Sequence, residues 1–114
     1  MDERRQDNRI DTQSVGMTVH DSINGEHIGI IGNLSSGGMM LITTQELYPD
    51  GILQLTLNPP PGCECAPISM GLKILWSTPA SSPAEYWVGL ETIDINAANE
   101  AAFADLLRYL DIRG

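Results

Sequence analysis

Positively charged side chains are scarce in this chain: its 114 residues include 6 Lys and Arg against 15 Asp and Glu, a formal net charge of −9. Binding to duplex nucleic acid draws most of its affinity from neutralised phosphates, so this balance opposes it. Anionic membrane surfaces are disfavoured for the same reason. A small anionic ligand stays compatible with the composition if the cations gather at its site, and three of the six lie within "RRQDNR", residues 4–9.

The chain also lacks long apolar runs. No stretch approaches the roughly 18 consecutive apolar residues of a membrane-spanning helix, so the sequence predicts no membrane insertion. Its first ten residues, "MDERRQDNRI", lack the apolar core of a secretory signal, and we therefore expect a cytoplasmic location. A length of 114 residues suits one folded domain and leaves little room for two.

Reactive motifs are few as well. The two cysteines, Cys63 and Cys65, form a Cys-Glu-Cys triplet, in which a disulfide would close a tight, strained ring, so we expect reduced thiols in a loop. Neither this pair nor His20 and His27 supplies the four ligands of a structural zinc site. No Ser-His-Asp set and no phosphate loop of the G-x-x-x-x-G-K type occurs. The sequence predicts a protein without catalytic residues, metal or cofactor.

A two-residue period of apolar side chains predicts a β-hairpin early in the chain. The alternation begins in "VGMTV", residues 15–19, and Asn24-Gly25 is the strongest short hairpin signal. A two-residue loop at Asn24-Gly25 would place Val19 opposite Ile30, with both side chains on the buried face. The two histidines would then lie diagonally across the outer face of the hairpin.

Four further strands are expected from the same alternation, at about residues 39–43, 53–58, 68–77 and 86–93. The loop "NPPPGCECAP" separates the second and third of these, because proline cannot donate to a strand ladder. Trp76 could lie near a bound ligand, but it falls on the apolar stripe of the strand at 68–77, which favours packing in the core.

The period changes after residue 95, where Asn96 is a plausible N-cap of a helix. Phe103, Leu106, Leu107 and Leu110 follow the i, i+3, i+4, i+7 spacing of an amphipathic helix. Six short strands in about 80 residues predict a small barrel or sandwich, with the helix packed on the sheet. We expect residues 1–12 to form a mobile arm and residues 13–114 to form the single domain.

Two short motifs could bind a ligand together. Residues 5–9, "RQDNR", fit R-x-x-x-R, and residues 33–38, "NLSSGG", fit [D/N]-x-S-x-x-G. Alone, the first is compatible with a solvated basic arm and the second with an ordinary β-turn. Together, in this order, they resemble the PilZ domain family of bacterial cyclic di-GMP receptors, and the strands ending "ILWS" and "WVGLETID" extend the resemblance over nearly the whole chain. It implies a mainly β fold, a six-stranded antiparallel barrel with a C-terminal helix.

The resemblance also implies a cyclic di-GMP site composed of Arg4, Arg5, Arg9, Asn33, Ser35 and Gly38. A guanidinium is planar and permanently charged; it can donate two hydrogen bonds to guanine O6 and N7, stack on a base or clamp a phosphate. Asn33 and Ser35 would contact the other guanine edge, and Gly38 would leave room for the ligand. An Arg directly before R-x-x-x-R accompanies a pair of intercalated ligands in this family. Arg4 therefore suggests two cyclic di-GMP molecules per chain.

The function implied is that of a signalling receptor, which orders its arm on binding cyclic di-GMP and regulates a separate, unidentified protein effector by contact. The alternative is a PilZ-type adaptor of pilus or motility machinery that acts without nucleotide. Such members typically lack one or both motifs, whereas this chain has both. A binder of single-stranded nucleic acid would need a basic face with exposed aromatic residues, which this acidic composition does not favour.

Overall fold

The structure, a computed structural model, describes residues 9–113, with side chains described as far as Asp111. Arg4 and Arg5, two of the expected ligand-binding residues, lie outside the described residues. Seven strands and one helix follow one another along the chain. They are β1 (Ile10–Asp11), β2 (Thr18–Asp21), β3 (His27–Ser35), β4 (Gly38–Thr43), β5 (Ile52–Asn58), β6 (Ile68–Pro79), β7 (Tyr86–Asp94) and α1 (Ala97–Arg113).

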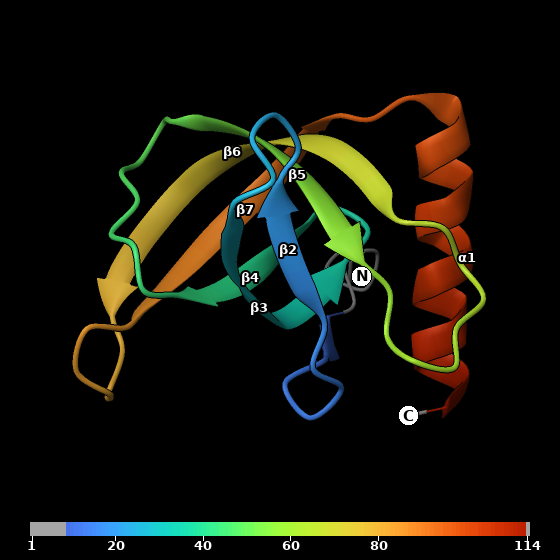
Figure 1. The fold of residues 1–114 in the computed structure, drawn as a ribbon, viewed down its shortest axis with the longest axis horizontal. Helices are drawn as coiled ribbons and strands as arrows, with labels where there is room; N and C mark the ends of the chain where they lie inside the picture. Colours follow the sequence, from blue (N-terminus) through green and yellow to red (C-terminus); the bar gives the residue numbers. More distant parts are fainter. Residues whose placement is uncertain (1–8, 114) are drawn as a thin grey trace, which may run out of the picture.

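Six of these strands close into an antiparallel barrel (Figure 1). The strand order is β3-β2-β5-β6-β7-β4, and the pairing of β4 with β3 closes the ring. The short strand β1 pairs with the end of β3 that extends beyond β2. The predicted six-stranded barrel with a C-terminal helix is therefore confirmed, with β1 as an additional strand.

Alternating apolar side chains from the strands fill the barrel. The buried residues of the core include Val19, Ile31, Leu34, Met39, Leu41, Leu55, Leu57, Leu72, Val88 and Leu90. Helix α1 stands beside the barrel and buries Phe103, Leu106 and Leu110 against it (Figure 1). The side-chain oxygen of Asn96 accepts the backbone N–H of Asn99 at 2.9 Å, so the predicted N-cap is confirmed.

The β2–β3 loop is longer than the two residues that Asn24-Gly25 predicts. Asp21 N donates to Glu26 O at 2.8 Å, which leaves the four residues 22–25 in the loop. The Asp21 carboxylate accepts the backbone N–H groups of Ile23 and Asn24, at 2.7 and 3.1 Å. This local capping by an aspartate stabilises the wider loop.

A β-bulge then shifts the pairing of β2 with β3. His20 lies opposite His27 and Val19 lies opposite Gly29, so Ile28 is the inserted residue. The predicted pair of Val19 with Ile30 is wrong by one position. Ile30 consequently faces outward and is partly exposed, while Ile28 and Val19 are buried.

A second bulge explains why Trp76 does not pack in the core. Strand β6 pairs with β7 at Ile74 opposite Leu90 and then at Trp76 opposite Gly89, so Leu75 is inserted. One inserted residue reverses the faces of all residues beyond it. Trp76 therefore lies on the outer surface with 42% of its area exposed, and the expected core position is wrong.

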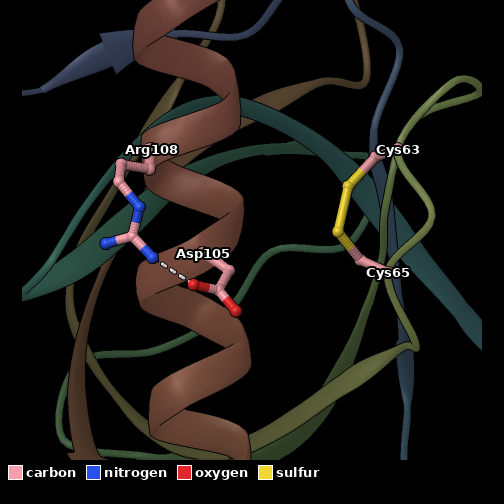
Figure 2. The surroundings of a disulfide bond; sticks show 4 residues. All are labelled: Cys63, Cys65, Asp105 and Arg108. Carbon is pink, nitrogen blue, oxygen red and sulfur yellow. Dashed lines mark hydrogen bonds and ion pairs between the residues drawn. A yellow bond between two sulfur atoms is a disulfide. The ribbon is translucent and has the colours of Figure 1, made fainter.

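The two cysteines are joined in a disulfide, which contradicts the expectation of free thiols. The loop turns sharply before them: Cys63 N donates to Pro60 O at 3.2 Å, and Gly62 has a φ of 94°. The two Cα atoms are consequently 5.4 Å apart, within the usual range for a disulfide. Figure 2 shows the bond beside α1, near the hydrogen-bonded pair of Arg108 and Asp105.

Ile10 and Asp11, which the sequence alone assigns to the arm, form strand β1 of the sheet. Ile10 pairs with Leu34 in β3, and Thr12 N donates to Gly32 O at 3.0 Å. The Thr12 hydroxyl is buried and donates to Ile31 O at 2.8 Å. Within residues 9–113, no helix is both long enough and apolar enough to cross a membrane.

Candidate ligand-binding site

A bulge in β3 places Asn33 on the outer surface of the barrel. Ile31 lies opposite Leu41 and Asn33 lies opposite Met40 in β4, so Gly32 is inserted between them. Beyond this point Leu34 faces inward and is buried, whereas Asn33 faces outward. A side chain at residue 32 would begin 3.1 Å from the indole of Trp87, so a glycine fits the bulge with the least displacement.

Strand β1 brings Arg9 to Asn33. Asp11 lies directly opposite Asn33, and Arg9, two residues earlier, faces the same side of the sheet. The Nη1 of Arg9 donates a hydrogen bond to the Oδ1 of Asn33 at 2.9 Å, across 24 positions of sequence. The last arginine of R-x-x-x-R and the first residue of [D/N]-x-S-x-x-G are therefore in direct contact.

Ser35 and Gly38 flank the tight β3–β4 turn and lie opposite each other. Ser35 is buried, and its hydroxyl donates to Gly38 O at 3.5 Å. A Cβ atom at residue 38 would lie 2.1 Å from Leu90 O in β7. Gly38 thus permits the close approach of β4 and β7, a packing role that the motif alone did not indicate.

The contact between Arg9 and Asn33 lies at one end of a row of outward-facing residues that crosses the sheet. Asp11, Asn33, Met40, Gly89 and Trp76 lie opposite one another in turn on β1, β3, β4, β7 and β6. We call these five residues the transverse row. The Nδ2 of Asn33 lies 3.9 Å from the sulfur of Met40, in position to donate a weak hydrogen bond.

Trp76 lies flat across the glycine of this row. The position that a Cβ of Gly89 would take is only 2.3 Å from the indole Nε1 and 2.4 Å from Cε2. The ring therefore extends over β7 in the direction of Met40, with one face against the sheet and part of its area exposed. An aromatic face held in this way offers a surface on which a planar group can stack.

The sequence identifies Asn33 near one end of the row and favours the wrong alternative for Trp76 at the other. It does not single out Met40 or Gly89, and it favours the core for Trp76 over a place near the ligand because the alternation gives no sign of the bulge at Leu75. The glycine within the apolar strand "WVGLE" was the available signal, since glycine inside a strand often marks a close approach.

Arg9 and the transverse row together combine groups whose chemistry suits a planar, hydrogen-bonding, anionic ligand. Arg9 supplies a cation with several donors, Asn33 supplies an amide, and Trp76 supplies an aromatic face.

Within the part of the chain that the structure describes, no three His, Cys, Asp or Glu side chains gather as metal ligands. His20 and His27 face each other on β2 and β3, where His20 Nδ1 lies 3.1 Å from Asn58 Nδ2.

A profile of the PilZ domain matches residues 3–109 of the sequence, which include both motifs. The chain belongs to the PilZ domain family. No curated protein sequence matches it.

Solved structures share the fold of this PilZ domain. The inhibitor of motility MotI (DgrA) of Bacillus subtilis is 20% identical with a TM-score of 0.75, over 98% of this chain and 51% of its own. YcgR of Escherichia coli in complex with c-di-GMP is 13% identical with a TM-score of 0.72, over 96% and 47%. The c-di-GMP complex of K. pneumonia MrkH is 19% identical with a TM-score of 0.72, over 99% and 55%. The chain thus spans about half the length of these proteins.

Proposed function

We propose that this PilZ domain is a cyclic di-GMP receptor whose binding surface is formed by Arg9, Asn33 and the outer face of Trp76. The contact between Arg9 and Asn33 carries the proposal, because it joins the two motifs of the family on one exposed surface. The solved complexes of YcgR and MrkH with c-di-GMP, which have the same fold, support the choice of ligand.

The chemistry of Arg9 and the transverse row suits a guanine dinucleotide. A guanidinium at residue 9 can donate two parallel hydrogen bonds to O6 and N7 of one guanine or pair with a phosphate. Neighbouring strands lie about 4.8 Å apart, so Asn33 and Trp76, three strands apart, are separated by at most about 14 Å. A compact ligand held by Arg9 at one end can therefore stack a second base on the indole.

The remaining arginines would complete the site. In this proposal Arg5 supplies the second guanidinium of R-x-x-x-R, and Arg4 allows a second cyclic di-GMP to intercalate with the first. A titration that saturates at two ligands per chain would support this role of Arg4, and saturation at one would exclude it. Ser35 takes part by holding the β3–β4 turn next to Asn33.

The output of the receptor would be a change in the N-terminal arm. Binding fixes residues 4–9 on the barrel, and this changes the surface that a separate protein effector contacts. The ordering costs conformational entropy, which the charge-assisted contacts must exceed. Amide hydrogen exchange tests this step: residues 4–9 should gain protection when cyclic di-GMP is added.

Calorimetric titration of cyclic di-GMP into the wild type, Arg9→Ala and Asn33→Ala tests the binding site. Each substitution should weaken binding by about 1–3 kcal/mol, or about 5- to 150-fold, the scale of one bidentate contact with guanine. The double variant should lose less than the sum of the single losses, because the two side chains are in contact.

Arg108→Ala provides the matched control. Arg108 is an exposed arginine on α1 that hydrogen-bonds to Asp105 one turn earlier, so its loss removes the same charge without touching the row. It should bind cyclic di-GMP like the wild type. Wild-type protein that takes up no ligand would reject the receptor and favour an adaptor that works without nucleotide.

A further inference from the structure

Large apolar side chains are exposed mainly on one part of the barrel. Seven are exposed in the described chain, and five of these belong to the 44–51 loop, β5, β6 and β7. We call these five residues the β5–β7 face: Tyr48, Ile52, Leu75, Trp76 and Ile93. The exposed fractions of Ile52, Leu75 and Ile93 are 55%, 47% and 48%.

The strand register groups these side chains around Lys73. Ile52 on β5 and Glu91 on β7 lie directly opposite Lys73 on either side. Leu75 follows two residues along β6, and Ile93 follows Glu91 by two residues along β7. The 44–51 loop that carries Tyr48 is tied to the same strand, because Asp50 N donates to Ile74 O at 2.8 Å.

Two bulges place aliphatic side chains on this face. Leu75 is the inserted residue in β6, and Ile93 is the inserted residue in β7, between Thr92 opposite Leu72 and Asp94 opposite Gly71. Bulges commonly direct a side chain away from the regular alternation. Both inserted residues are aliphatic and about half exposed. A surface that contacts only water could carry polar residues at these positions, so the two aliphatic side chains indicate contact with a partner. Exposed apolar side chains that gather on one part of a protein mark an interaction surface.

The charges around the face indicate the kind of partner. Lys73 forms an ion pair with Asp50, with 3.7 Å between Nζ and the carboxylate. Glu91 and Asp94 are exposed on β7. The face therefore carries one cation, Lys73, and three carboxylates, Asp50, Glu91 and Asp94. A second copy would bring the same excess of carboxylates and a net charge of −9 to the contact, and like charges across an interface are costly. A partner with basic side chains is complementary.

We propose that the β5–β7 face docks a protein partner whose contact surface combines apolar side chains with Lys or Arg. The inference rests on the proposed function only in identifying this partner with the effector of the receptor. The docking contact itself needs no nucleotide. Trp76 belongs both to this face and to the transverse row, so the partner and cyclic di-GMP would bind next to each other.

NMR titration with two synthetic amphipathic helical peptides tests the chemistry of this face. One peptide combines Leu with Lys and the other combines Leu with Glu at the same positions. Backbone amide shifts of the ¹⁵N-labelled chain should change on β5, β6 and β7 with the Lys peptide alone. Ile52→Glu and Leu75→Glu should each weaken that binding at least tenfold, and Glu91→Lys should also weaken it. Ile23→Glu, at an exposed isoleucine in the β2–β3 loop, should bind like the wild type.

Several outcomes would overturn the proposal. They are no binding of the Lys peptide, equal binding of the two peptides, backbone amide shifts on another face of the barrel, or a loss of peptide binding in Ile23→Glu as large as in Ile52→Glu. A wild-type dimer in sedimentation that Leu75→Glu dissociates would assign the face to a second copy instead. Cyclic di-GMP titrated into Ile52→Glu separates the two proposals, because Ile52 lies outside the transverse row. If Ile52→Glu binds the nucleotide like the wild type but no longer binds the Lys peptide, the docking proposal is supported independently of the nucleotide site.

Discussion

The orientation of Trp76 depends on the absence of a side chain at Gly89, and Gly89→Ala should therefore weaken cyclic di-GMP binding without unfolding the barrel. The added Cβ would lie 2.3 Å from the indole Nε1, whereas carbon atoms in contact are about 3.5 Å apart or more. The indole must therefore shift by roughly 1 Å or rotate off β7. Stacking of a base on an aromatic side chain contributes about 1–3 kcal/mol, so a displaced ring should reduce affinity by about 5- to 150-fold.

Calorimetry with Gly89→Ala, Trp76→Ala and the double variant measures this effect. The double variant should bind no more weakly than Trp76→Ala alone, because both substitutions remove the same stacking surface. Gly71→Ala is the matched control on the neighbouring strand, where the new Cβ would lie 3.1 Å from Nε2 at the flexible end of Gln54 and 3.2 Å from the Cβ of Asp94. It should leave the affinity unchanged.

Because Gly89 lies on the outer surface of the barrel, Gly89→Ala should change ligand affinity without a large change in the free energy of unfolding. Alanine inside a strand is favoured over glycine by about 0.5–1 kcal/mol, so urea unfolding of Gly89→Ala should differ from the wild type by no more than about 1 kcal/mol. Wild-type affinity in both Gly89→Ala and Trp76→Ala would refute a role of the indole in the site and would confine the ligand to the end near Arg9.

The remaining predictions concern stability. Gly38→Ala should lower the free energy of unfolding by about 1–3 kcal/mol in urea denaturation, because its Cβ would lie 2.1 Å from Leu90 O; an unchanged midpoint would contradict the packing role. Thr12→Val should cost about 0.5–1.5 kcal/mol by removing a buried hydrogen bond that anchors β1, and Thr12→Ser should restore part of it. Replacing Cys63 and Cys65 together by Ser should cost only about 1.6 kcal/mol on the chain-entropy estimate for so short a loop; a loss above about 3 kcal/mol would indicate that the loop supports α1 in another way.

The sequence by itself determined the features that repeat along the chain. The two-residue alternation in "LQLTL" and the helical spacing of Phe103, Leu106 and Leu110 follow from which side chains must be buried, and the structure confirms β5 and α1. Asn96 was recognised as an N-cap because capping involves only neighbouring backbone groups. The two ligand motifs were visible for the same reason, since each is a contiguous stretch with its own chemistry.

Only the tertiary structure decided which side chains share the outer surface. Each bulge depends on how a strand pairs with its neighbours, and one inserted residue, such as Gly32 or Leu75, reverses every side chain beyond it. The outward position of Trp76 therefore could not be obtained from its own strand. The contact between Arg9 and Asn33 likewise depends on the pairing of β1 with β3 across 24 positions. Such long-range pairing is set by the closed barrel as a whole, because no local pattern specifies which strand lies beside which.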